Sequence, residues 1–108
     1  MKVIAVDFDG TLCKDQWPAI GRANRKLIND LIAARKAGDR VILWTCRSGA
    51  LLEEAVAWCG SRGLTFDAVN ENLKENIEKY GGDTRKVFAD VYIDDKNLIA
   101  DGPFIFCG

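Results

Sequence analysis

The sequence predicts an α/β domain with a mostly parallel sheet that helices cover on both faces. Short apolar runs alternate with longer segments in which apolar residues recur every three or four positions, a pattern typical of strands alternating with helices. Strand–helix–strand units form right-handed crossovers, which make the connected strands parallel. With 108 residues the chain is long enough for one core, so we expect a single domain over residues 1–108.

The first half of the chain supplies two strands and two helices. Val3–Val6 is an unbroken apolar run, as in a strand buried on both faces. A short polar and aromatic passage, Cys13–Ile20, precedes a helix predicted over Arg22–Lys36 by its helical spacing of apolar residues. Arg40–Trp44 predicts the second buried strand. Ser48 is then placed as the N-cap of a helix that runs to about residue 62.

The strands and the helix predicted in the second half of the chain are short. A weaker strand, a short helix and two more strands are predicted at Thr65–Val69, Leu73–Tyr80, Asp90–Ile93 and Phe104–Cys107. The expected sheet therefore has five strands.

Composition excludes several classes of protein. The net charge is −1 and the basic residues are scattered among acids, which argues against binding duplex nucleic acid through bulk electrostatics. No apolar run approaches the length of a membrane span, and the N-terminal run is too short for a signal peptide. We therefore expect a cytoplasmic protein that does not enter a membrane.

The four cysteines do not form a metal-binding pattern. They lack C-x-x-C spacing and the chain has no histidine, so a zinc site is not supported. We expect buried free thiols. Cys13 and Cys46 follow proposed site elements closely, so a reactive thiol is the alternative at those two positions.

Polar side chains cluster immediately after the predicted strands. In open parallel sheets, ligands bind beyond the carboxyl ends of the strands. The sequence therefore predicts a site at that edge, built from pairs that follow successive strands: Asp7 and Asp9, Thr45 and Arg47, Asn70 and Asn72, and Asp94 and Asp95.

The segment D-F-D-G-T after the first strand carries the main chemical signal. If the chain stays extended, Asp7 and Asp9 point to the same side, and two carboxylates so close together favour a hard cation such as magnesium. Gly10 permits a tight turn, and Thr11 adds a hydroxyl and an amide. The alternative is a solvated turn, since these are ordinary turn residues.

The string V-D-F-D-G-T-L resembles the first motif of the haloacid dehalogenase superfamily of phosphohydrolases. The resemblance extends to Thr45 as the Ser or Thr that ends the second strand and to the late acidic pair in V-Y-I-D-D. Lys86 matches the motif lysine best, with Lys96 and Lys74 as alternatives. The four motifs occur in the family's order.

This resemblance implies a three-layer Rossmann-like fold with five parallel strands in the order 5-4-1-2-3. The chain has no room for a cap domain between Leu12 and Arg22 or between Asn70 and Lys86. It looks most like the small uncapped members found in bacteria and phages. The site is then open. Open members act on exposed or macromolecular phosphates, or they close the site with small loops or a partner subunit, such as a second copy of the chain.

The resemblance also implies a reaction, the magnesium-dependent hydrolysis of a phosphate monoester. Asp7 would attack phosphorus to form an aspartyl-phosphate, and Asp9 would act as general acid and then as base. Magnesium would be bound by Asp7, Asp9 (through its backbone carbonyl), Asp94 and Asp95. Phosphate oxygens would bind Thr45, Lys86 and, as a bidentate donor, Arg47.

The rim of the site would contact the remainder of a phosphorylated substrate, whose class the sequence does not specify. Trp17, Asn70 and Asn72 are the predicted rim residues, with packing of Trp17 on the first helix as the alternative.

Two other functions remain open at this point. One is a phospho-accepting receiver domain, although there the acidic pair follows the first strand, whereas here it comes late. The other is an inactive phosphate-binding module with the same fold.

Overall fold

The computed structural model describes residues 1–82 and 87–95. Six strands and three helices occur in this part of the chain. In order they are β1 (Val3–Val6), β2 (Cys13–Gln16), β3 (Ala19–Ala23), α1 (Arg25–Lys36), β4 (Arg40–Leu43), α2 (Gly49–Gly60), β5 (Ala68–Val69), α3 (Lys74–Tyr80) and β6 (Val91–Ile93).

The main sheet has the order β5-β4-β1-β6, and all of its neighbouring strands are parallel. This confirms the predicted α/β class with a parallel sheet. The four strands also lie in the relative order that was predicted for them. The fifth predicted strand, Phe104–Cys107, lies outside the described residues, so the full order 5-4-1-2-3 stays a prediction.

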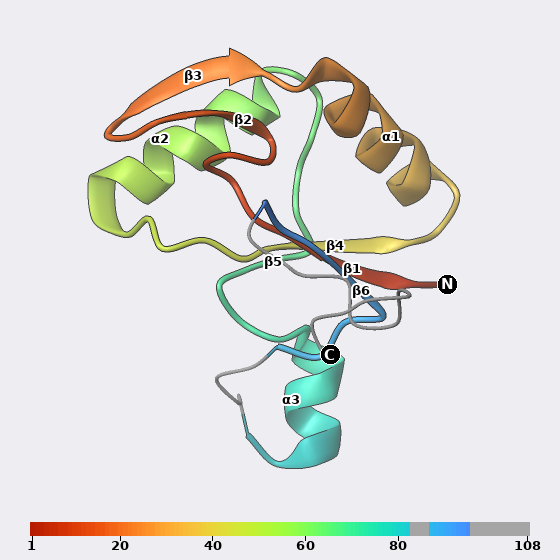
Figure 1. Ribbon diagram of the computed structural model, residues 1–108. Helices are drawn as coiled ribbons and strands as arrows, with labels where there is room; N and C mark the ends of the chain where they lie inside the picture. Colours follow the sequence, from red (N-terminus) through yellow and green to blue (C-terminus); the bar gives the residue numbers. More distant parts are fainter. Residues whose placement is uncertain (83–86, 96–108) are drawn as a thin grey trace, which may run out of the picture.

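Helices cover both faces of the sheet, with α1 and α2 on one face and α3 on the other (Figure 1). Side chains alternate along β1 accordingly. Ile4 and Val6 belong to the core cluster under α1 and α2, whereas Val3 and Ala5 pack in the cluster that contains Leu73 at the start of α3. Burial on both faces explains why β1 is an unbroken apolar run.

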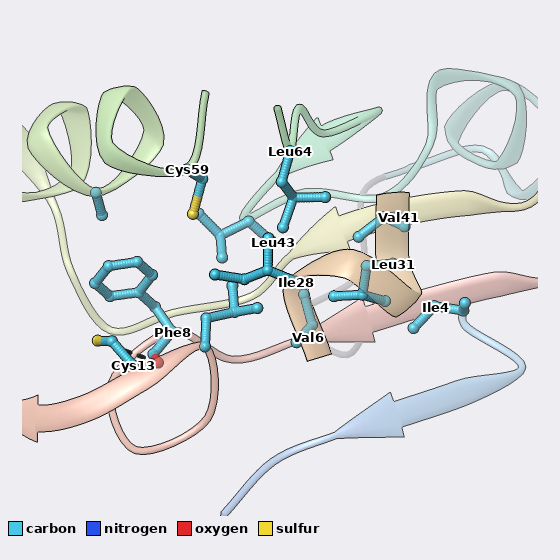
Figure 2. Packing of buried hydrophobic residues seen from close by; sticks show 12 residues of the cluster. Ile4, Val6, Phe8, Cys13, Ile28, Leu31, Val41, Leu43, Cys59 and Leu64 are labelled. Atoms are coloured by element: carbon cyan, nitrogen blue, oxygen red, sulfur yellow. Dashed lines mark hydrogen bonds between the residues drawn. The ribbon is translucent and has the colours of Figure 1, made fainter. Parts of the chain in front are cut away.

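The larger core cluster extends beyond the end of β1. Phe8 is fully buried within this cluster (Figure 2). Its ring meets that of Trp58 in α2 edge to face, with the ring centroids 5.5 Å apart. Leu12 is fully buried as well. These two apolar anchors hold the turn between Asp7 and Cys13 against the body of the protein, which fixes the polar residues that lie between them.

The passage after this turn differs from the prediction. Residues 13–23 form an antiparallel hairpin of β2 and β3, with a register irregularity between Cys13 and Asp15, so the helix does not begin at Arg22. Helix α1 begins at Arg25 because Asn24 caps it: the Asn24 Oδ1 accepts a hydrogen bond from the Leu27 N–H. The Asn24 Nδ2 also donates to the Thr11 carbonyl, which ties the helix start to the D-x-D turn.

Other boundaries differ by a few residues. Ser48 is the N-cap of α2, as predicted, but its side chain makes no capping hydrogen bond, and α2 ends at Gly60 with Ser61 as the C-cap. Strand β5, Ala68–Val69, is shorter than the predicted Thr65–Val69.

No cap domain occurs within residues 1–82 and 87–95, where the hairpin is the insertion between β1 and α1. In this part of the chain, no helix is long and apolar enough to cross a membrane.

Asp67 joins α1 to the sheet. Its carboxylate accepts two hydrogen bonds from the Arg35 guanidinium, at 3.1 and 2.8 Å, and one from the Val41 N–H at 2.7 Å. Burial alone would raise the pKa of Asp67, but these hydrogen bonds and the charges of Arg35 and Arg40 lower it below its usual 3.8. A lowered pKa means that the folded state favours ionised Asp67.

We predict that Asp67→Asn lowers the free energy of unfolding at pH 7 by about 1–3 kcal/mol, because charge-assisted bonds to Arg35 and Val41 are lost. The stabilisation by ionised Asp67 is present above pH 3.8 and is lost as the pH falls through the lower folded pKa. The free energies of unfolding of wild type and variant, measured by urea denaturation, should therefore differ at pH 7 and become equal in strong acid. Asp30→Asn, in the exposed Lys26–Asp30 pair, is the control and should have little effect. An equal loss in both variants would contradict this assignment.

Candidate functional site

Three carboxylates converge at the carboxyl edge of the sheet. The Asp7 N–H donates to the Ile93 carbonyl at 2.9 Å, which extends the β1–β6 pairing by one residue and brings Asp94 beside Asp7. Carboxylate oxygens of Asp7, Asp94 and Asp95 all lie within 4.8 Å of one another. The sheet order thus joins acids that are far apart in the sequence.

Gly10 makes room for this cluster. It has φ +84, in the left-handed region, and a Cβ at this position would overlap the Asp95 carboxylate. Both the backbone conformation and the close approach therefore require glycine. The role predicted for Gly10 in a tight turn is confirmed, and its contact with Asp95 adds a second reason for it.

Burial and mutual repulsion make the cluster unfavourable without a counter-charge. Burial raises the pKa of Asp7 to about 6; the hydrogen bond from the Phe8 N–H opposes the rise, and the charges of Asp94, Asp95 and Asp9 add to it. A set of carboxylate oxygens at this separation is the donor type that Mg²⁺ prefers. The three acids therefore fit the predicted cation chemically.

A cavity of about 300 Å³ adjoins the acidic cluster, lined by Asp7, Trp44, Thr45, Cys46 and Asp94. The Thr45 N–H donates to the Asn70 Oδ1 at 2.7 Å, and the Thr45 Oγ1 accepts from the Arg47 N–H at 3.2 Å. These bonds hold the loop after β4 beside Asp7. Thr45 and Asp7 thus line the same cavity, and the predicted contact of Thr45 with phosphate stays a prediction.

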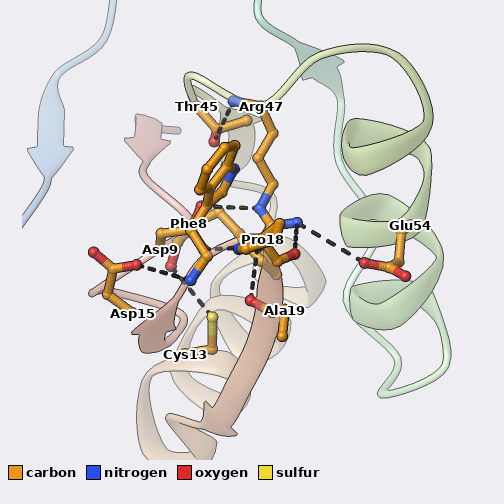
Figure 3. Close-up of polar contacts among 10 residues, drawn as sticks. Phe8, Asp9, Cys13, Asp15, Pro18, Ala19, Thr45, Arg47 and Glu54 are labelled. Carbon is orange, nitrogen blue, oxygen red and sulfur yellow. Dashed lines mark hydrogen bonds and ion pairs between the residues drawn. The ribbon is translucent and has the colours of Figure 1, made fainter.

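Asp9 points elsewhere, and this corrects two expectations. Its two oxygens accept hydrogen bonds from Nε and Nη2 of Arg47, at 2.9 and 2.8 Å (Figure 3). Asp9 is not a member of the three-carboxylate cluster, so its side chain does not join Asp7 as expected from i, i+2 alternation. Arg47, with a side chain only 1% exposed, is a buried ion-pair partner and not a free bidentate donor for phosphate.

The turn after β1 explains why the two aspartates separate. The Phe8 carbonyl accepts hydrogen bonds from the N–H groups of Thr11 and Leu12, at 3.1 and 2.9 Å, which closes a tight turn immediately after Asp7. The extended conformation that alternation needs therefore ends at Phe8. Thr11 lies buried in this turn, and its hydroxyl has no hydrogen-bond partner among residues 1–82 and 87–95.

The predicted rim residues divide into three cases. Asn70, with φ 54, binds the Thr45 N–H and supports the loop after β4, so its side chain is structural. Asn72 is buried, and its Oδ1 accepts from the Phe88 N–H at 2.6 Å, so the expectation that it lies at the rim is wrong. Trp17 is 60% exposed at the turn between β2 and β3, which excludes close packing on α1.

The remaining candidates are located only in part. Lys86 and Lys96 lie outside the described residues. Cys13 and Cys59 are buried free thiols, as expected, and Cys46 is exposed on the cavity. Trp44 was missed as a cavity residue. Its position at the end of an apolar run, just before Thr45, is the signal that identifies it.

Comparison with known proteins adds a family relationship without a function. Neither a protein-family model nor a curated protein matches the sequence. The fold resembles the solved structure of a conserved protein from Bacteroides thetaiotaomicron, with a TM-score of 0.80 and 41% identity. The match covers 90% of this chain and 78% of that one. The chain belongs to the same family as that protein. Because no activity is named for that protein, the function of this chain has to be inferred from the geometry of its site.

We predict that Asp7→Asn stabilises the protein when divalent cations are removed. The folded pKa of Asp7 is raised, so the stability it contributes is full below pH 3.8 and is lost as the pH rises through about 6. Neutral asparagine avoids that loss. After allowance for solvent screening at this half-buried site, the variant should gain about 1 kcal/mol above pH 6 and nothing below pH 4, by urea denaturation with a chelator. A variant less stable than wild type at pH 8 would contradict the assigned repulsion.

Proposed function

We propose that the protein is a magnesium-dependent phosphatase that hydrolyses phosphate monoesters through Asp7. The observation that carries this proposal is the convergence of Asp7, Asp94 and Asp95 beside a cavity that Thr45 also lines. The resemblance of the four motifs to the haloacid dehalogenase superfamily supports it. Carboxylate oxygens of the three residues all lie within 4.8 Å of one another, which supports a single small cation between them.

Each residue has a defined task in the proposed reaction. The Asp7 carboxylate attacks phosphorus, an oxygen–phosphorus bond forms, and the bond to the leaving oxygen breaks. Asp9 gives that oxygen a proton and later takes one from the water that hydrolyses the aspartyl-phosphate. The Thr45 hydroxyl donates to a phosphate oxygen. Magnesium held by Asp7, Asp94 and Asp95 would offset the negative charge of the phosphoryl group.

We predict that the protein hydrolyses a generic aryl phosphate when Mg²⁺ is present and that Asp7→Asn abolishes this turnover, because the nucleophile is lost. Release of the aryl alcohol is the measurement, with and without chelator. Asp30→Asn, far from the site on α1, is the matched control and should keep full activity. Full activity of Asp7→Asn, or no dependence on Mg²⁺, would refute the covalent mechanism.

A phospho-accepting module is the second candidate, and the Asp9–Arg47 pair favours it. Both Asp9 oxygens already bind the guanidinium, so fewer lone pairs of Asp9 remain for moving protons. If proton transfer is poor, the phosphoryl group stays on Asp7 after it has been accepted. The two functions then differ in the lifetime of the aspartyl-phosphate.

We predict that a small acyl phosphate phosphorylates Asp7 and that the adduct turns over within seconds, because the proposed enzyme must release it. Intact-protein mass spectrometry after rapid quenching measures the adduct, with Asp7→Asn as the unlabelled control. An adduct that persists for many minutes without turnover would favour the phospho-accepting module over the phosphatase.

A further inference from the structure

Arg47 connects four parts of the molecule through one guanidinium group. Besides the two bonds to Asp9, its Nη1 donates to the Pro18 carbonyl at 3.3 Å and its Nη2 to the Ala19 carbonyl at 3.1 Å (Figure 3). The Phe8 ring lies below it, 5.0 Å from the guanidinium carbon. Glu54 of α2 approaches Nη1 at 3.9 Å. This is a large number of partners for one side chain.

The guanidinium is a rigid plane, so these contacts are geometrically coupled. Asp9 binds one edge of this plane, and the carbonyls of Pro18 and Ala19 accept hydrogen bonds from other N–H groups of the same guanidinium. Pro18 lies in the turn between β2 and β3, and Ala19 is the first residue of β3. The hairpin and Asp9 therefore share one rigid connector, and a displacement of either one changes the hydrogen bonds of the other.

Burial makes the connection strong. A buried cation that loses a partner pays the desolvation penalty of the groups left unpaired, whereas an exposed one is rescued by water. The Arg47 side chain is 1% exposed and that of Asp9 is 18% exposed. The Glu54 carboxylate, in contrast, is 58% exposed and lies beyond hydrogen-bond distance, so it adds little.

We propose that Arg47 is a positioning residue that couples the β2–β3 hairpin to Asp9. It orients the Asp9 carboxylate through two bonds and leaves the remaining lone pairs of that carboxylate for the leaving group or water. The position of the hairpin thereby sets the position of Asp9. This inference rests on the proposed phosphatase activity for its kinetic consequence, but the mechanical coupling does not depend on that activity.

Hydrogen exchange tests the coupling without any assay of turnover. Amides of residues 13–23 should exchange faster in Arg47→Lys, which keeps the charge but loses the planar fork, and also in Asp9→Asn, which frees one end of the connector. Glu54→Gln is the matched control, because it removes a charge near Arg47 without breaking a hydrogen bond. Unchanged exchange of the hairpin in both test variants would overturn the inference. If Arg47→Lys fails to fold, hydrogen exchange in Asp9→Asn, which retains Arg47, decides whether the coupling exists.

A double-mutant cycle tests the kinetic consequence. Arg47→Lys should lower kcat about tenfold to a hundredfold with KM unchanged, because a misplaced proton-transfer group slows chemistry and not binding. In an Asp9→Asn background the same substitution should change kcat less than twofold, since Asp9 is the group through which Arg47 acts. An equal loss in both backgrounds, or a rise in KM alone, would mean that Arg47 binds substrate directly and would overturn the inference. Absence of hydrolysis by the wild type would refute the proposed function, and hydrogen exchange alone would then decide the coupling.

Discussion

Strand β1 is paired on both edges and buried on both faces, and the site depends on this double constraint. The pairing with β4 and β6 continues past the end of the strand, because the Asp7 N–H binds the Ile93 carbonyl and the Trp44 N–H binds the Val6 carbonyl. Parallel strands end at the same edge of a sheet, so the residues after β1, β4 and β6 must meet there. The backbone at Asp7 is thus held from two sides before any ligand arrives.

The site sorts its charges into two environments. Asp7, Asp94 and Asp95 share an electronegative pocket, whereas Asp9 is neutralised by a buried arginine a short distance along the chain. The hydrogen bonds to the Phe8 carbonyl make this division, because they bend the chain between the two aspartates. Two acids that are neighbours in the sequence therefore acquire different chemistry: one repels its neighbours and calls for a cation, and the other already has its counter-charge.

Regular patterns were enough to predict the layers and the parallel pairing, because these depend on hydrophobic periodicity and on the rules of chain crossover. The meeting of Asp7 with Asp94 followed from the strand order that the family resemblance implies. The hairpin was missed because Cys13–Gln16 and Ala19–Ala23 carry no clean alternation: three residues of β2 are exposed, and its pairing contains an irregularity. The roles of Arg47 and Asn72 could not be predicted either. Both are polar residues that the fold buries with specific partners. Polar residues that follow a strand are also typical of exposed rims, so the sequence pattern does not distinguish the two cases.

The hairpin also has a consequence for how such a scaffold can diversify. Within the described residues it forms a separate two-stranded sheet, and Trp17, which lies in the turn of the hairpin, is 60% exposed. Lengthening the turn between Gln16 and Ala19 would add surface to the hairpin without shifting the register of any strand of the main sheet. A loop grafted at this point could bind new partners while the main sheet and the acidic cluster at its edge stay the same. The inserted chain would have to leave the carbonyls of Pro18 and Ala19 in place, because both accept hydrogen bonds from Arg47.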